Sequence, residues 1–405
     1  MPARRLPAWP LAAVVVALAA APAASARVPS IGAPAAIVID ASTGEMLFGR
    51  HETDTRAIAS TTKLMTAMLT LARTQPGQVF AMPPYAAGAG ESKIGLRTGE
   101  RMKVHDLLRA MMLPSANDAA YDLAVNIGGT KARFVRLMNQ RARALGLTET
   151  HYSTPVGLDD PRNYSSARDL ARLASLLLRN PTFAKVVDLP SARLRSGSHP
   201  RIVLNRNTLV RRYPFVNGVK TGHTAAAGYV LVGAAGEGGA EVVTAVLGTP
   251  SEAARDADSL ALLRWGVSQF RRSRAVVGGR AYARANVRWR DGEKVELAAE
   301  HSYSLTVRRG FRVTRRIEAP SEVQGPLPKG SRVGSIQILY RGHVVKAVPL
   351  VTATPVEGAG ILRKVASALG GPFPALALLG LVAAAASLGL RVRATRVMRG
   401  EKAAR

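Results

Sequence analysis

A serine and a lysine three positions apart are the residues best suited to chemistry in this sequence. Ser60 and Lys63 stand in a run, residues 59–68, whose apolar members follow the lysine closely. Side chains three residues apart share one face of a helix, so the amine of Lys63 can reach the hydroxyl of Ser60. Burial or a second cation lowers the pKa of an amine and lets it accept a proton. The pair predicts a nucleophile with a lysine base, although the tetrad alone is also typical of a helix N-cap serine beside a solvated lysine.

Two further short motifs follow at wide spacing. Ser115-Ala116-Asn117 interrupts a stretch with helical periodicity, and Lys220-Thr221-Gly222 ends a β-rich run. Each motif alone is typical of caps, turns and strand ends. In this order, however, Ser-x-x-Lys, Ser-x-Asn and Lys-Thr-Gly form the set found in penicillin-binding proteins and class A β-lactamases. Alanine replaces the central residue of the middle motif, whereas the serine and asparagine that would carry its chemistry remain.

Four longer segments extend this similarity. The chain resembles the serine-type D-alanyl-D-alanine carboxypeptidases, the low-molecular-weight penicillin-binding proteins of peptidase family S11, over nearly all of its secreted part. Segments that look like family signatures are residues 95–100, 115–120, 154–159 and 217–224. The resemblance implies an α/β (α+β) penicillin-binding/β-lactamase-like transpeptidase fold, followed by a small all-β domain and a membrane anchor.

The resemblance implies a role for each residue of the first two motifs. Ser60 attacks the carbonyl carbon of the penultimate D-alanine, with Lys63 as its base. Ser115 relays a proton to the leaving amine, and Asn117 orients the substrate amide and Lys63. No cofactor or metal is expected, because the seven histidines show no metal-ligand spacing.

The same resemblance assigns the substrate-binding side of the cleft. Lys220 supplies positive charge, which also helps keep the lysine base neutral, and Thr221 hydrogen-bonds the substrate carboxylate. The backbone amides of Ser60 and His223 form the oxyanion hole. Arg255 is the expected carboxylate-binding arginine, with a solvated helix arginine as the alternative, and the His223 imidazole lacks the acidic orienter that a catalytic base needs. The substrate-binding residues implied are Lys220, Thr221, Gly222, His223 and Arg255.

Composition limits the class of protein. The 405 residues suit two domains, 47% apolar content suits a sizeable core, and the formal charge is +29. Such a polycation is attracted to anionic wall polymers or lipid headgroups, whereas 5% aromatic content without interleaved basic runs disfavours nucleic acid. The absence of cysteine excludes disulfides and thiolate metal sites.

Periodicity places strands at both ends of the first domain and helices between them. Strands from the two ends are expected to pair into one antiparallel sheet with an inserted helical subdomain and a cleft where the two parts meet. Short, turn-punctuated strands between residues 281 and 351 predict the small all-β domain. The predicted strands of the first domain are residues 35–40, 45–49, 216–221, 228–234 and 241–247, and its predicted helices are residues 60–73, 104–124 with a break at 113–117, 131–145, 167–178 and 251–270.

Both termini carry membrane signals. Residues 1–26 predict a secretory signal peptide, with an uncleaved anchor as the alternative. No charged residue occurs over residues 365–390 and six basic residues follow, which favours a single-pass cell-membrane protein with an extracytoplasmic catalytic domain over a buried soluble helix. The predicted parts are the catalytic domain 27–275, the β-rich domain 276–356, a linker 357–371, a transmembrane helix 372–390 and a basic cytoplasmic tail 391–405.

The function that these features favour is removal of the terminal D-alanine from peptidoglycan stem peptides during cell-wall maturation, with β-lactam antibiotics such as penicillin as covalent inhibitors. A class A-like β-lactamase is an alternative, but it needs a glutamate between the second and third motifs, and residues 150–236 contain none. Endopeptidase activity is also compatible with the motifs, as is a non-catalytic envelope protein that binds peptidoglycan.

Overall fold

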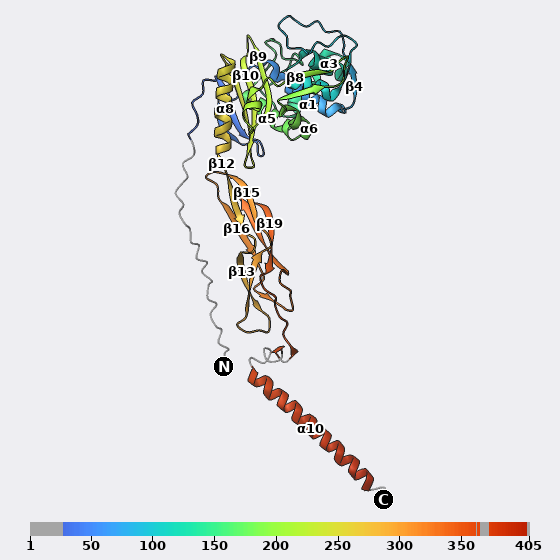
Figure 1. Cartoon of the computed structure of the whole chain (residues 1–405). Helices are drawn as coiled ribbons and strands as arrows, with labels where there is room; N and C mark the ends of the chain where they lie inside the picture. The colour runs from blue at the N-terminus through green and yellow to red at the C-terminus, as the bar shows by residue number, and fades with distance from the viewer. Residues whose placement is uncertain (1–26, 362, 365–371, 403–405) are drawn as a thin grey trace.

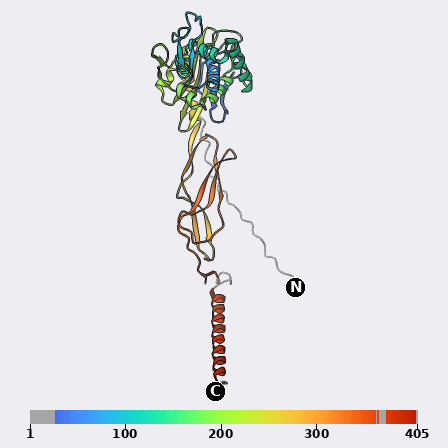
Figure 2. The same ribbon diagram turned by 90° about the vertical axis from the view of Figure 1, so that its right-hand side faces the viewer.

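The computed structural model of the chain describes residues 27–361, 363–364 and 372–402. A globular domain is followed by a narrower all-β domain placed end to end with it (Figures 1 and 2). The predicted signal peptide lies outside the described residues, as do residues 365–371 of the predicted linker and residues 403–405 of the predicted tail.

The first domain is built on a five-stranded antiparallel sheet in the order β2-β1-β11-β10-β9. Strands from the two ends of the domain meet in its middle, where Ile37 pairs with Ala245. The predicted sheet of terminal strands is therefore confirmed. Its members are β1 (Ala35–Asp40), β2 (Met46–Arg50), β9 (Val216–Thr224), β10 (Gly228–Glu237) and β11 (Ala240–Thr249).

Both faces of this sheet are covered, which explains why β1 is apolar at nearly every position. Successive side chains of a strand point to opposite faces, so Val38 packs into one core with Leu262 of helix α8 (Glu252–Ser268), and Ile37 packs into the other with Leu170 of helix α5 (Ala167–Leu178). Figure 1 shows α8 running along the sheet beside β10. Ser251 begins α8 by accepting a hydrogen bond from the Ala254 amide at 3.1 Å.

The helical block is inserted between β2 and β9. It breaks between α2 and α3, as the sequence predicts, but a 3-10 turn precedes the first α-helix where one continuous helix was expected. The remaining elements of the block are η1 (Ala59–Thr62), α1 (Lys63–Arg73), α2 (Val104–Met112), α3 (Asn117–Gly128), α4 (Lys131–Ala144), α6 (Pro181–Val187), α7 (Thr208–Arg212) and the pairs β3 (Arg56–Ala57) with β6 (Tyr164–Ser165), β4 (Val79–Ala81) with β5 (Arg101–Lys103), and β7 (Ser191–Leu194) with β8 (Arg201–Leu204).

The second domain has its own hydrophobic core, in which Leu297, Ile336 and Leu350 are fully buried. This agrees with the predicted small all-β domain. Strand β12 (Phe270–Val276) follows α8 directly and pairs with β15 (Tyr303–Arg308). A six-stranded sheet in the order β16-β18-β19-β14-β13-β17 contains β13 (Ala281–Val287), β14 (Lys294–Ala299), β16 (Val313–Glu318), β17 (Glu322–Val323), β18 (Arg332–Tyr340) and β19 (His343–Thr352).

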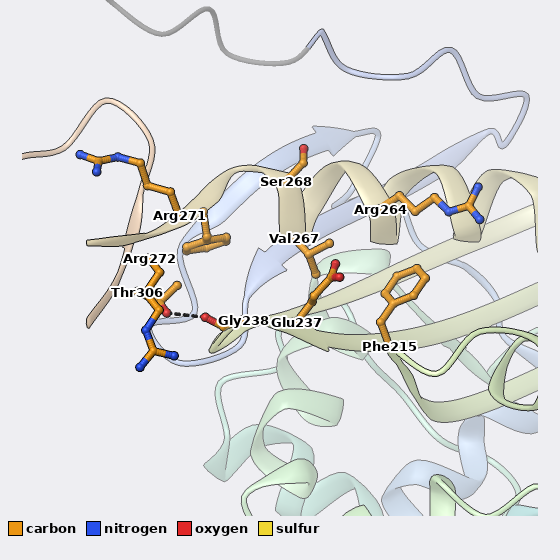
Figure 3. Close-up of a pocket in the computed structure, with 10 residues that line it drawn as sticks. Phe215, Glu237, Gly238, Arg264, Val267, Ser268, Arg271, Arg272 and Thr306 are labelled. Atoms are coloured by element: carbon orange, nitrogen blue, oxygen red, sulfur yellow. Dashed lines mark hydrogen bonds between the residues drawn. The ribbon is translucent and has the colours of Figure 1, made fainter. Parts of the chain in front are cut away.

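The two domains are joined by polar contacts. Glu45, in the turn between β1 and β2, forms ion pairs with Arg308 and Arg341 of the β domain. The Thr306 hydroxyl donates to the Gly238 carbonyl at 2.7 Å, beside a cavity of about 520 Å³ that opens at this junction (Figure 3). None of the predicted site residues lines this cavity.

The C-terminal helix α10 (Pro372–Lys402) covers the predicted transmembrane segment and continues into the basic tail. Pro372, the first described residue of this helix, is tolerated there because the first turn of a helix needs no intrahelical backbone amide. Within the described ranges, no helix combines the length and the apolar character that crossing a membrane requires.

Candidate active site

Ser60 and Lys63 lie next to each other at the start of the helical block. Ser60 belongs to the turn η1, and Lys63 is the first residue of α1. The Lys63 Nζ donates to the Ser60 Oγ at 2.8 Å, so the predicted contact between amine and hydroxyl is present. Ala59, just before the serine, has a positive φ of 46°, which an L-residue with a side chain rarely adopts. The serine therefore sits on a tight, constrained turn.

Lys63 also bonds to residues that are distant in sequence. Its Nζ donates to the Asn117 Oδ1 at 2.6 Å and to the Val156 carbonyl at 2.7 Å, and its side chain is fully buried. Three acceptors satisfy the three donors of an ammonium, and the same oxygens hold a neutral amine in place. Val156 belongs to the segment 154–159, one of the sequence signatures, and this segment also contacts α1 through the Pro155 carbonyl, which accepts from the Thr66 hydroxyl at 2.7 Å.

The environment of Lys63 allows its amine to act as a base near neutral pH. Burial, together with the positive charge of Arg206, lowers the pKa of this amine to about 7, although Glu91 and Asp118 act in the opposite direction. A pKa near neutrality suits a group that must accept a proton and return it.

A further cation, besides the predicted Lys220, acts on the amine of Lys63. The sequence assigns to Lys220 the charge that keeps Lys63 neutral, and the positive charge of Arg206 also lowers the pKa of Lys63. Burial lowers the pKa of Lys220 itself well below its ordinary value, and repulsion by Lys63 and Arg206 adds to the shift, so the two lysines disfavour each other's protonated form. The sequence does not indicate Arg206, because it is an exposed residue in an Asn-Arg-Asn bend that resembles an ordinary loop.

Ser115 has an unusual backbone and an unused hydroxyl. Its φ of 67° is positive, its side chain is only 3% exposed, and its Oγ has no hydrogen-bond partner in the described part of the chain. A strained residue with an unsatisfied buried hydroxyl is costly unless a ligand completes it. Ser115 is thus available to a substrate atom in the way that the proton-relay prediction requires.

Strand β9 brings the third motif against the nucleophile turn. A Cβ built on Gly222 would lie 3.1 Å from the Ser60 backbone nitrogen and 3.1 Å from the Ala59 Cβ, so a larger residue would have to push the nucleophile turn away by a few tenths of an ångström. Lys220, two residues earlier on the same face, is 1% exposed and donates to the Thr221 carbonyl at 2.8 Å.

The remaining predicted substrate-binding residues have distinct surroundings. Thr221 is buried, whereas His223 is exposed and its ring stacks on Tyr229 with centroids 4.0 Å apart. Arg255 is 3% exposed, and its guanidinium pairs with Glu252 and Asp256 of its own helix, at 2.7 Å in each case. Arg255 is therefore not the solvated helix arginine of the alternative, and its positive charge contributes to lowering the pKa of Lys220.

Glu91 is a site residue that the sequence did not indicate. It lies in the segment between β4 and β5, and its Oε2 accepts a hydrogen bond from the Asn117 Nδ2 at 2.7 Å. The glutamate expected of a class A β-lactamase would come from the interval between the second and third motifs, whereas this carboxylate comes from the interval between the first and second. Its only signal is its position a few residues before the signature at 95–100.

The chain matches two protein-family models and is similar to proteins and solved structures that are already known. A family model described as D-alanyl-D-alanine carboxypeptidase matches residues 22–251, and a model for the C-terminal domain of penicillin-binding protein 5 matches residues 270–358. The chain is 31% identical to D-alanyl-D-alanine carboxypeptidase DacA of Escherichia coli, over 84% of this chain and 87% of that protein. It is 29% identical to D-alanyl-D-alanine carboxypeptidase DacF of Bacillus subtilis, over 82% of this chain and 87% of that protein. Penicillin-binding protein 5 of Haemophilus influenzae has a similar structure, with a TM-score of 0.58, 29% identity and coverage of 81% of this chain and 98% of that one.

Proposed function

The chain belongs to the serine-type D-alanyl-D-alanine carboxypeptidase family, peptidase family S11, and on that premise we propose that it removes the terminal D-alanine from peptidoglycan stem peptides through an acyl-enzyme on Ser60. The observation that carries the assignment of the nucleophile is the buried amine of Lys63, whose pKa is about 7 and whose Nζ lies 2.8 Å from the Ser60 Oγ.

Acylation then follows from these contacts. The Ser60 Oγ forms a bond to the carbonyl carbon of the penultimate D-alanine as its proton passes to the neutral amine of Lys63. The carbon–nitrogen bond to the terminal D-alanine breaks, and the leaving amine takes a proton delivered through the Ser115 hydroxyl. Asn117 keeps Lys63 in place throughout, and the backbone amides of Ser60 and His223 stabilise the oxyanion.

Deacylation restores the enzyme. A water molecule attacks the ester carbonyl, one of its protons passes to the basic group of the site, and the ester bond to the Ser60 Oγ breaks as that oxygen regains a proton. A β-lactam would form the same type of ester on Ser60, which makes this antibiotic class the expected covalent inhibitor. Lys220, Thr221, Gly222, His223 and Arg255 are assigned to the binding of the substrate backbone and its terminal carboxylate.

The decisive experiment measures free D-alanine released from a peptide that ends in D-Ala-D-Ala, with the full-length protein and its Ser60→Ala variant. Release by the unmodified protein and none by the variant is the expected result. Ser42→Ala removes a hydroxyl from the turn between β1 and β2 and serves as the matched control. Release that persists in Ser60→Ala would exclude Ser60 as the nucleophile, and a folded protein that neither releases D-alanine nor binds penicillin covalently would contradict the activity.

The second part of the proposal concerns location. We infer that the chain is a single-pass protein of the cell membrane, with the catalytic domain 27–275 and the β-rich domain 276–356 outside the cytoplasm and a linker, residues 357–371, leading to the membrane helix 372–390. The support is the uncharged run 365–390 followed by six basic residues, together with the signal-like first 26 residues.

Protease treatment of intact spheroplasts should digest the catalytic domain while a tag placed after residue 405 stays protected. A protected catalytic domain, or extraction of the protein by alkaline carbonate, would contradict this location.

A further inference from the structure

Glu91 is held in place by several hydrogen bonds in the segment between β4 and β5. The Gly88 amide donates to its Oε1 at 2.7 Å, and the Tyr85 hydroxyl and the Asn117 Nδ2 both donate to its Oε2. Tyr85 in turn stacks on Tyr121 of helix α3, with ring centroids 4.5 Å apart. The carboxylate is therefore fixed relative to the helix that begins with Asn117.

The amide of Asn117 has only one favourable orientation between its two partners. Its Oδ1 accepts from the Lys63 Nζ at 2.6 Å, and its Nδ2 donates to Glu91 at 2.7 Å. An ionised carboxylate only accepts hydrogen bonds, so a rotated amide would turn its oxygen toward Glu91 and lose that bond. It would also lose the bond from Lys63 whenever that amine is protonated, because an ammonium only donates. Glu91 thus determines which end of the Asn117 side chain faces the base.

The charge of Glu91 also acts on the base. Lys63 is influenced by Arg206, which lowers its pKa, and by Glu91 and Asp118, which raise it, and its charge is also opposed by that of Lys220 on β9. In the other direction, burial raises the pKa of Glu91, but hydrogen bonds from Tyr85, Asn117 and the Gly88 amide, together with the charge of Lys63, give a net downward shift. Glu91 is consequently ionised at neutral pH and faces Lys63 across a single side chain.

We propose that Glu91 is a positioning residue for the reaction: it holds the Asn117 amide with its oxygen toward Lys63 and places a negative charge beside the Ser60–Lys63 pair. The proposal rests on the proposed function, because it assigns the effect to the acylation of Ser60. It also links the segment between β4 and β5 to catalysis, since any movement that withdraws Glu91 would release Asn117 and change the basicity of Lys63.

Two substitutions separate the hydrogen bond from the charge. Glu91→Gln keeps an acceptor for the Asn117 Nδ2 but removes the negative charge. The acidic limb of the pH profile for acylation by a fluorescent penicillin should therefore move to lower pH, by roughly half a unit to one unit. Glu91→Ala removes both features and should lower the acylation rate about tenfold or more across the profile, because Asn117 is no longer held. Recovery of most of this rate in Glu91→Gln is the expected signature of positioning.

The control is Glu237→Gln, the same chemical change at an exposed position at the end of β10. Glu237 lies six residues beyond Leu231, which pairs with Thr221 of the third motif. Its profile should match that of the unmodified protein. A Glu91→Gln profile identical to the unmodified one would overturn the proposal. Unchanged acylation with slower release of the penicilloyl group would also overturn it, in favour of a role in activating water.

A titration of Lys63 by nitrogen-15 NMR distinguishes this proposal from the function on which it rests. Loss of the Glu91 charge should lower the pKa of Lys63 in the folded protein whether or not D-alanine is released. If the unmodified protein lacked activity but this shift appeared, the proposed function would fail while the coupling between Glu91 and the amine would stand. If activity depended on Ser60 but Lys63 titrated unchanged in Glu91→Gln, the present proposal alone would fail.

Discussion

The Lys63 Nζ lies 2.6 Å from the Asn117 Oδ1, although 54 residues separate the two along the chain. Each is the first residue of its helix, Lys63 of α1 and Asn117 of α3. The contact joins two of the three sequence motifs through one hydrogen bond and leaves the Lys63 amine facing Ser60. The base therefore depends on the packing of two helix N-termini as well as on its own burial.

The first prediction concerns the pH dependence of acylation. Because the pKa of Lys63 is about 7 and only its neutral form accepts a proton, the acylation rate should fall as the pH decreases through 7 and reach a plateau above it. The rate constant for labelling by a fluorescent penicillin, measured across this range, checks the expectation. A rate that stays constant from about pH 5 to 8 would show that a different group is the base.

The second prediction concerns Arg206. Replacing this arginine by glutamine removes a positive charge that disfavours the protonated form of Lys63, so the pKa of the amine should rise. The acidic limb of the acylation profile should then move to higher pH, by roughly half a unit to one unit, and labelling below pH 7 should slow. Arg211→Gln makes the same change at an exposed position of helix α7 and should leave the profile in place. A shift toward lower pH in Arg206→Gln would contradict the electrostatic assignment.

How far the sequence predicts this site depends on how each contact is made. Ser60 and Lys63 are neighbours on one local turn, so spacing alone places them together. Asn117 joins them through tertiary packing, and only the motif pattern identifies it. Arg206 and Glu91 act from segments without regular periodicity, and an isolated charge in a loop has no sequence signal that distinguishes it from a solvated one.

The fold follows the same rule. Helix α5 has the predicted bounds, Ala167–Leu178, because its apolar spacing and its N-cap are local features, the latter shown by Ser166, which accepts from the Asp169 amide at 3.1 Å. The helix predicted over residues 251–270 ends at Ser268 instead, and Phe270, its last predicted residue, begins strand β12. Pairing with β15, more than thirty residues later, makes it a strand.

The third prediction concerns the stability cost of Lys220. Its pKa is lowered in the folded protein, so the unfolded chain binds more protons at neutral pH and the amine destabilises the fold there. Lys220→Met should raise the free energy of unfolding by about 1–2 kcal/mol at neutral pH, and the gain should shrink as the pH rises toward the ordinary pKa of lysine. Activity should be lost at the same time, as expected for a residue kept for function at the expense of stability.

Chemical denaturation at neutral and alkaline pH measures this effect. Lys185→Met is the matched control, because Lys185 is exposed on helix α6 and its replacement should change the free energy of unfolding little at either pH. A Lys220→Met variant that is less stable than the unmodified protein at neutral pH would mean that the bond to the Thr221 carbonyl outweighs the cost of burying the amine.

The fourth prediction concerns Gly157, which, like Gly222, packs closely against the nucleophile turn. Its φ is +86°, and a Cβ at this position would lie 2.0 Å from the Ala59 carbonyl oxygen and 2.9 Å from the Thr62 Oγ1. Gly157→Ala should displace the turn that carries Ser60, lowering both the acylation rate, by about tenfold or more, and the free energy of unfolding, by roughly 2 kcal/mol or more.

Gly129→Ala separates backbone strain from this clash, because Gly129 has a similar φ of +77° but no atom within 4 Å of its built Cβ. The control should lose some stability through strain and keep its acylation rate, since it lies at the C-terminal end of α3, away from the motif residues. Equal acylation rates in the two variants would show that the close approach of Gly157 to Ala59 does not hold the nucleophile in place.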